Sequence, residues 1–353
     1  MNTTQKLYMM NQFPNNPDQQ VTLANWRTSP YNKWAFQHVR ELVPSANIQN
    51  NPSKAQNLPQ EKYDFSAVKV ELDNQSQLTY EEFLKITDTD ALIILKDGII
   101  IEERYFHEMA RSTPHILMSV SKSILGLLIG ILIDQKIFKA ADKVCAILPE
   151  LNSTAYKEAT IRDLLDMRTG VIFVEDYLAT SGLMIDYRKA TNWNPLENNE
   201  APSDLRSFYR LLDKKSHPDG KQFNYVSPNS DLLGWIIERS TGERFSDLLS
   251  DLFWKPLGAT MPSYITVDRL GAPRVAGGLC TTAIDLALVG QLFLDYGFSN
   301  GQQILPKNWL QDIQENGSRN AWLEGNFAEY FPNRDMHYSC LLYTSPSPRD
   351  KRL

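Results

Sequence analysis

The most strongly apolar stretch of the chain covers residues 116–133, where hydrophobic side chains would lie on almost every side of a helix. A helix of this kind is buried in the core of a large protein or spans a membrane. The stretch is long enough for a span, but it contains Lys122 and three serines, and an isolated charge is costly inside a bilayer. The pattern therefore predicts a buried core helix.

Two mostly apolar runs, residues 91–96 and 99–105, flank the dipeptide Asp97-Gly98. This dipeptide is typical of the two-residue type I′ turn, which joins neighbouring antiparallel strands. The sequence therefore predicts a β-hairpin ahead of the buried helix.

Beyond the apolar stretch the pattern is mostly helical. Residues 160–167 predict a helix that ends at Gly170. The other predicted helices cover residues 203–213, 228–240, 244–254, 281–296 and 306–315. Residues 171–202 carry only scattered apolar positions, and a loop of this length in a compact domain is usually functional or disordered.

The chain order is strands, then a block of helices, then further strands. This order indicates an α+β fold, in which helices flank an antiparallel sheet and a helical subdomain is inserted. We expect residues 61–160 and 266–339 to form the sheet domain and residues 161–265 the helical subdomain, with the loop 171–202 at the active site. Residues 1–60 are rich in Asn and Pro and predict an extended arm. Its aromatic side chains are expected to anchor it on the body: Trp26, Tyr31, Trp34 and Phe36.

Ser119 and Lys122 form an S-x-x-K motif near the start of the apolar stretch. Residues three apart lie on one face of a helix, so the Lys122 amine can reach the Ser119 hydroxyl. If Ser119 lies in the first helical turn, its N–H is unpaired and can stabilise an oxyanion. The motif recurs at Ser66 and Lys69, but residues 65–72 alternate as in a half-buried strand, which would separate these two side chains onto opposite faces.

Two interpretations of Lys122 are open at this point. Its flexible stem could carry the ammonium group to the surface. Alternatively, burial and the helix N-terminus lower the pKa of Lys122, which leaves a neutral amine able to take a proton from the serine.

Tyr225 stands just before a helix start at Pro228, in a position that projects side chains into a cleft. A lone tyrosine is usually an ordinary half-buried side chain. It becomes a proton shuttle only if neighbouring cations lower its pKa, and Lys122 is the candidate cation.

Composition narrows the classes of function. The 353 residues are 42% apolar, and 36 basic against 42 acidic residues give a net charge of −6, so we expect no nucleic-acid partner. Cys145, Cys280 and Cys340 lack metal-ligand spacing and are odd in number, so the sequence signals neither a metal site nor a disulfide framework, and no cofactor is expected. The polar N-terminus lacks the apolar core of a signal peptide, which favours the cytoplasm, and we expect no membrane partner.

Four segments of the chain resemble the class C β-lactamase-like serine hydrolases, and most closely their 6-aminohexanoate-dimer hydrolase branch. The segments are residues 117–123, 160–165, 223–231 and 276–287. The resemblance runs from about Trp26 to Ser339, and four motifs in order are more specific than any one. It implies a β-lactamase/penicillin-binding-protein-like fold with Ser119 as nucleophile, Lys122 as its base, and Tyr225 passing a proton to the leaving group.

The resemblance also implies substrate contacts. A loop tyrosine that closes over substrate in these relatives matches Tyr177, and Trp193 lies further along the same loop. β-Lactamases have Asn two places after the catalytic tyrosine, whereas this chain has Ser227, which argues against lactam chemistry. Amide-cleaving relatives can place an acidic loop residue where this chain has Arg188, and that acid receives the substrate's amino group.

The family also has a C-terminal strand with a Lys/His-x-Gly-type box that supplies the second oxyanion amide. No such box follows residue 286, and the similar Arg168-Thr169-Gly170 reads as a helix C-cap. Residues 340–353 resemble one reading frame of a sequencing adapter. We therefore expect residues 340–353 to be a non-native tail that packs against little, and the sheet to lack its C-terminal strands.

These features together predict a serine hydrolase that acts on small esters or amides through an acyl-enzyme. The expected partner is a small-molecule ester or amide substrate, and the sequence is also compatible with a homodimer. Two alternatives remain: a catalytically silent binding or scaffold protein on the same fold, and a Ser/His/Asp hydrolase. The second lacks support because the chain contains no G-x-S-x-G motif.

Overall fold

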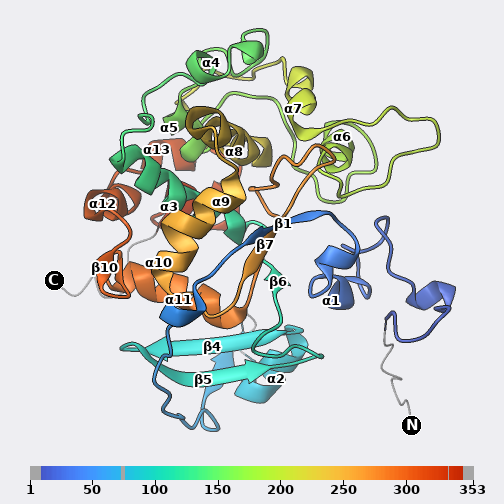
Figure 1. Ribbon diagram of the computed structural model, residues 1–353, viewed down its shortest axis with the longest axis vertical. Coiled ribbons are helices and arrows are strands. Elements are labelled where there is room, and N and C mark those ends of the chain that lie inside the picture. The colour runs from blue at the N-terminus through green and yellow to red at the C-terminus, as the bar shows by residue number, and fades with distance from the viewer. Residues whose placement is uncertain (1–8, 73–75, 333, 345–353) are drawn as a thin grey trace.

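The computed structural model describes residues 9–72, 76–332 and 334–344 and consists of helices packed around short antiparallel sheets (Figure 1). The strands are β1 (Ser45–Ile48), β2 (Lys69–Glu71), β3 (Gln77–Thr79), β4 (Ala91–Lys96), β5 (Ile99–Tyr105), β6 (His115–Ile116), β7 (Ser263–Thr266), β8 (Leu279–Thr281), β9 (Phe298–Ser299), β10 (Gln302–Gln303), β11 (His337–Ser339) and β12 (Leu342–Thr344). The α-helices are α1 (Asn32–Ala35), α2 (Tyr80–Ile86), α3 (Val120–Asp134), α4 (Val144–Ile147), α5 (Ile161–Leu165), α6 (Leu183–Ala190), α7 (Leu205–Phe208), α8 (Ser227–Thr241), α9 (Phe245–Leu249), α10 (Lys255–Leu257), α11 (Ala283–Leu294), α12 (Lys307–Glu315) and α13 (Arg319–Leu323).

A four-stranded antiparallel sheet runs in the order β1-β7-β8-β6. Its edge strand β1 pairs with β7 so that Ala46 lies opposite Ile265. Residues 45–48 were expected to be part of an extended arm, but they form an edge strand because their backbone groups pair with β7. Within the described residues this sheet receives no strand from beyond β8.

Aromatic side chains anchor the N-terminal segment on the body, as predicted. Trp26 is fully buried and lies edge-on to Trp193, with ring centroids 5.2 Å apart. The Trp26 indole Nε1–H donates to the Trp193 carbonyl oxygen at 3.1 Å. The Phe36 carbonyl accepts the Ile116 N–H at 2.9 Å, so the segment also bonds to the strand ahead of α3.

The predicted hairpin is confirmed as β4 and β5, which form a separate antiparallel pair (Figure 1). Asp97 and Gly98 both have positive φ, at 51° and 77°, as a type I′ turn requires. One face of the hairpin is covered by α11, which packs against β4.

The buried core helix is confirmed as α3, although Ile116 belongs to β6 and the helix begins only after Ser119. A Cβ at Gly130 would lie 2.2 Å from the Trp309 ring, and the Trp309 Nε1–H donates to the Gly126 carbonyl at 3.0 Å. Glycine is needed here because α12 approaches the backbone of α3 closely. With 15 residues, α3 is too short to cross a bilayer, and no other described helix is both long and apolar enough to do so.

The helix predicted at residues 160–167 is α5, and it begins with a capping box between Thr160 and Asp163. It ends earlier than predicted, and Met167, at φ 52°, takes the left-handed conformation that was expected of Gly170. Gly170 is instead required by crowding, because a Cβ there would lie 1.8 Å from the His217 carbonyl oxygen.

The remaining helices follow the prediction with local differences. The loop 171–202 contains the helix α6. The predicted helix 203–213 is split into α7 and a 3₁₀ turn, Tyr209–Leu211, and the predicted helix 244–254 is α9 followed by a π turn, Ser250–Trp254. Three predicted helices are confirmed, namely α8, α11 and α12.

The expectation that the chain from residue 340 packs against little is wrong for residues 340–344. Cys340 and Leu341 are buried, and their backbone N–H groups donate to the Asp166 carboxylate at 3.1 Å and to the Leu165 carbonyl at 2.8 Å. The hairpin of β11 and β12 thereby covers the end of α5, because apolar surface and free acceptors are available there. Residues 345–353 lie outside the described part of the chain.

Candidate active site

Ser119 lies at a sharp corner between β6 and α3. Met118, directly before it, has a positive φ of 45°, which is an uncommon conformation for a residue with a side chain. Ser119 is the N-cap of α3, and its carbonyl accepts the Lys122 N–H at 3.1 Å. Among the described residues its own N–H has no acceptor, so this amide is free to stabilise a negatively charged oxygen.

Lys122 is buried, with 1% of its surface exposed, so the interpretation in which its stem reaches the surface is wrong. Its Nζ donates to Ser119 Oγ at 2.9 Å and to the Ala276 carbonyl at 2.6 Å. Burial lowers the pKa of Lys122 from 10.5 to about 8, against the opposing effect of the Glu175 charge. A substantial fraction of this amine is therefore neutral near physiological pH.

Tyr225 is brought to the same corner by the loop ahead of α8. Its ring centroid lies 5.0 Å from Lys122 Nζ, and its side chain is close enough to Ser119 for that residue to affect the pKa of Tyr225. The sequence suggested that cations would lower the pKa of Tyr225, but burial raises it, and the nearby Ser119 only partly opposes this. Tyr225 is therefore a neutral phenol at physiological pH.

Two residues that sequence reasoning missed hold Tyr225 in place. Phe327 stacks on its ring at 5.1 Å between centroids with 17° between planes, and Asn326 Oδ1 accepts the Tyr225 N–H at 3.3 Å. They lie about a hundred positions away and carry no motif, so only the fold reveals them.

Glu175 ties the long loop to the start of α8. Its carboxylate accepts the Ser227 N–H at 2.7 Å and the Ser227 hydroxyl at 2.6 Å. The Tyr177 hydroxyl donates to the same carboxylate at 2.8 Å, while 61% of the Tyr177 side chain is exposed. The hydroxyl of Ser227 is thus engaged with Glu175, and Tyr177 stands over the site with free lone pairs on its oxygen.

Behind Lys122, a buried ion pair supports the segment that Lys122 contacts. Arg274 pairs with Asp231 and also contacts the Tyr187 hydroxyl. The other oxygen of Asp231 accepts the Ala276 N–H at 2.8 Å. Asp231 therefore positions the residue whose carbonyl accepts a hydrogen bond from Lys122.

A cavity of about 820 Å³ opens beside Ser119. The predicted contact residues Tyr177, Arg188, Trp193 and Ser227 all line it. Trp193 forms an apolar wall, because its indole N–H is bound to Thr266 Oγ1 at 3.2 Å. No group of three or more His, Cys, Asp or Glu side chains among the described residues is placed to hold a metal ion.

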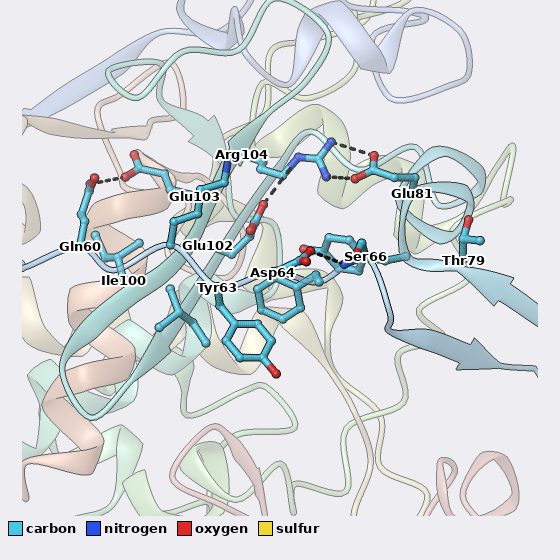
Figure 2. A pocket seen from close by; sticks show the side chains of 14 residues that line it. Gln60, Tyr63, Asp64, Ser66, Thr79, Glu81, Ile100, Glu102, Glu103 and Arg104 are labelled. Carbon is cyan, nitrogen blue, oxygen red and sulfur yellow. Dashed lines mark hydrogen bonds and ion pairs between the residues drawn. The ribbon is translucent and has the colours of Figure 1, made fainter.

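A second cavity, of about 880 Å³, lies beside the hairpin and contains Ser66, the serine of the other S-x-x-K copy (Figure 2). Ser66 lies in a turn ahead of β2, and its N–H donates to Asp64 Oδ1 at 2.9 Å. Arg104 lines this cavity and pairs with Glu81, which also lines it, at 2.9 Å (Figure 2). No hydrogen bond joins Ser66 to Lys69 within the described residues, so this copy lacks the nucleophile–base contact.

Comparison with known proteins places the geometry in a family. A profile of the family described as Beta-lactamase matches residues 83–342. The 6-aminohexanoate-dimer hydrolase of Paenarthrobacter ureafaciens is 32% identical over 311 residues, which cover 88% of this chain and 77% of that protein. A Bacillus anthracis structure assigned as a 6-aminohexanoate-dimer hydrolase aligns with a TM-score of 0.83 and 26% identity, covering 93% of this chain and 84% of its own. The octameric penicillin-binding protein homologue from Pyrococcus abyssi shares the fold, with a TM-score of 0.55 and 17% identity over 74% of this chain and 63% of its own.

Proposed function

The chain belongs to the beta-lactamase family and is related to 6-aminohexanoate-dimer hydrolase, and from this premise we propose that it is a serine hydrolase that cleaves small esters or amides through an acyl-enzyme at Ser119. The observation that carries the proposal is the contact of 2.9 Å between the Nζ of the buried Lys122 and Ser119 Oγ. A serine hydroxyl is a weak nucleophile until an adjacent base removes its proton. Lys122 supplies that base because burial brings its pKa to about 8.

In the acylation step, the neutral Lys122 amine takes the Ser119 proton as Oγ attacks the substrate carbonyl carbon. The Ala276 carbonyl accepts one N–H of the amine, and Ser119 Oγ lies 2.9 Å from the same nitrogen, so the neutral amine can turn its lone pair toward the serine. The tetrahedral oxyanion accepts a hydrogen bond from the free Ser119 N–H at the start of α3.

In the second step, the C–O or C–N bond to the leaving group breaks and Tyr225 donates its phenolic proton to the departing atom. A neutral phenol is the correct protonation state for a donor, and the raised pKa of Tyr225 maintains it. The Lys122 ammonium then returns a proton to Tyr225. A water molecule hydrolyses the acyl-enzyme by the same proton path and releases the acid.

Ester substrates demand less of this machinery than amides, since an amide nitrogen must be protonated as it leaves. Tyr177 is placed to help with amides, because its oxygen can accept a hydrogen bond from the substrate N–H while its own proton is bound by Glu175. Ser227 is less suited to lactams, because its hydroxyl is engaged with Glu175.

A fluorophosphonate probe tests the proposal, since it forms a covalent bond only with an activated serine. We expect intact-protein mass spectrometry to show a single adduct and peptide mapping to place it on Ser119. Ser66→Ala, in the second motif copy, is the matched control and should retain the adduct, whereas Ser119→Ala should lose it. An unlabelled wild-type chain would favour the alternative of a catalytically silent binding protein on this fold.

A further inference from the structure

The cavity beside Ser119 is bordered by three guanidinium groups, Arg27, Arg188 and Arg274. Arg274 is neutralised by its ion pair with Asp231. The other two have no such partner: among the described residues neither Arg27 nor Arg188 takes part in an ion pair. Two positive charges at this wall therefore lack a carboxylate of their own.

Arg188 is held by neutral oxygens only. Its Nη2 donates to the Tyr177 carbonyl at 2.8 Å and its Nη1 to the Ala179 carbonyl at 3.5 Å. The residue is only 6% exposed, and its Nε–H has no acceptor. Burying a cation without a counter-charge is costly, so this position is favourable only if something else compensates it.

Arg27 repeats the same pattern from the N-terminal segment. Its Nη2 contacts the amide oxygen of Asn194, and its Nε–H also lacks an acceptor. Burial, together with the charges of Arg188 and Arg274, lowers the pKa of Arg27 to about 10. Because the positive charges of these three guanidinium groups repel one another, binding an anion between them would relieve the repulsion.

The acidic groups around the cavity do not cancel this charge. Glu175 is occupied by Ser227 and Tyr177. The charge of Asp176 acts to raise the pKa of Arg188, but Asp176 is exposed and accepts the Leu178 N–H. Glu197 is exposed at the rim of the cavity, and Glu200 is paired with Lys189. The wall at Arg27 and Arg188 therefore keeps a positive surplus.

We propose that the substrate of this enzyme is an ester or amide that carries a free carboxylate, and that Arg27 and Arg188 bind that carboxylate while Ser119 attacks the scissile carbonyl. This inference rests on the proposed function, because the carboxylate site and the nucleophile line the same cavity. A planar guanidinium binds a carboxylate through two parallel hydrogen bonds, and a desolvated site strengthens them. Half-esters and half-amides of dicarboxylic acids, and N-acyl amino acids, are the substrate classes that fit.

Two matched pairs of esters test the inference. The first pair compares mono(4-nitrophenyl) adipate, which carries the carboxylate on the acyl side, with methyl 4-nitrophenyl adipate. The second pair compares 3-carboxyphenyl butyrate, which carries the carboxylate on the leaving group, with 3-carbamoylphenyl butyrate. We expect the charged member of at least one pair to have a kcat/KM about tenfold higher, which corresponds to about 1.4 kcal/mol. In Arg188→Gln and in Arg27→Gln this preference should fall toward one.

The control is Arg206→Gln, an exposed arginine paired with Glu238 that lies outside this cavity, and it should preserve both rates and the preference. Arg27→Gln keeps the test valid if Arg188→Gln does not fold, because Arg27 is only half-buried. Equal rates for charged and neutral esters in both pairs would overturn the carboxylate inference and leave the hydrolase proposal standing.

A binding measurement separates the two proposals if no ester is cleaved. Adipate is titrated into the wild-type chain by isothermal titration calorimetry, and we expect binding that weakens about tenfold in Arg27→Gln and is unchanged in Arg206→Gln. Absence of adipate binding to the wild type would overturn the inference. Binding without turnover or fluorophosphonate labelling would instead refute only the serine hydrolase.

Discussion

Replacing Lys122 with methionine should remove activity and, at neutral pH, remove a burden on stability. The pKa of Lys122 falls from 10.5 in its ordinary state to about 8 in the folded chain. At about 1.36 kcal/mol per pKa unit, this difference means that the charged amine opposes folding by about 3 kcal/mol. Methionine fills a similar volume without the charge, but it leaves the Ala276 carbonyl without its donor, at a cost of about 1–3 kcal/mol. The two effects nearly cancel at pH 7.

The pH dependence distinguishes the two effects. Between pH 8 and 10.5 the unfolded chain holds a proton on Lys122 that the folded chain has lost, so the stability of the wild type rises with pH through this window. The penalty is fully present below about pH 8 and disappears above pH 10.5. The loss of the Ala276 hydrogen bond in Lys122→Met does not depend on pH. Wild type should therefore gain about 2–3 kcal/mol relative to the variant between pH 7 and pH 10.

Urea unfolding of both proteins at a series of pH values measures this difference, since all other titrating groups are shared. In parallel, kcat/KM of the wild type for a 4-nitrophenyl ester should rise with pH about a midpoint near 8, because only the neutral amine accepts the serine proton. Lys122→Met should lose about 10²–10⁴-fold in kcat/KM. Parallel stability curves for the two proteins would refute the assignment of a depressed pKa to this lysine.

Three further predictions follow from the same geometry. Ser119→Ala and Tyr225→Phe should each remove most turnover while leaving thermal unfolding little changed. The double variant should be little worse than the single variants because the two residues share one proton path, and additive losses in kcat/KM would contradict this. Tyr177→Phe should slow anilide cleavage more than ester cleavage, and equal losses would exclude this hydroxyl from the chemistry. Gly130→Ala should lower the free energy of unfolding in urea by about 1–3 kcal/mol, because the indole ring of Trp309 in α12 occupies the space of the added methyl group. Gly290→Ala on α11, where that space is open, should not lower it, and equal effects of the two substitutions would contradict the packing argument.

Local rules account for the parts of the site that sequence could predict. The contact between Ser119 and Lys122 follows from a spacing of three on a helix, and the hairpin follows from the positive φ that Asp97 and Gly98 tolerate. Both depend on residues close together in the chain. Capping of α5 by Thr160 is predictable for the same reason.

Contacts between distant segments account for what was missed. Glu175 engages Ser227 across 52 positions, and Asn326 holds Tyr225 across 101 positions. Neither Glu175 nor Asn326 has a neighbour pattern that marks it. The direction of the Tyr225 pKa shift was wrong for a related reason: desolvation depends on everything packed around the phenol, and sequence showed only its candidate cation.

The N-terminal segment is part of the candidate site rather than an appendage. Trp26 packs edge-on against Trp193 and bonds its carbonyl, while the adjacent Arg27 contacts Asn194 and borders the cavity. One buried aromatic anchor thus fixes both the apolar wall and one of the two unpaired cations. Ser119, the proposed nucleophile, is the N-cap of α3, whereas these contacts come from the N-terminal segment and the long loop. Changes in the cavity wall can therefore leave the corner that holds Ser119 unaltered.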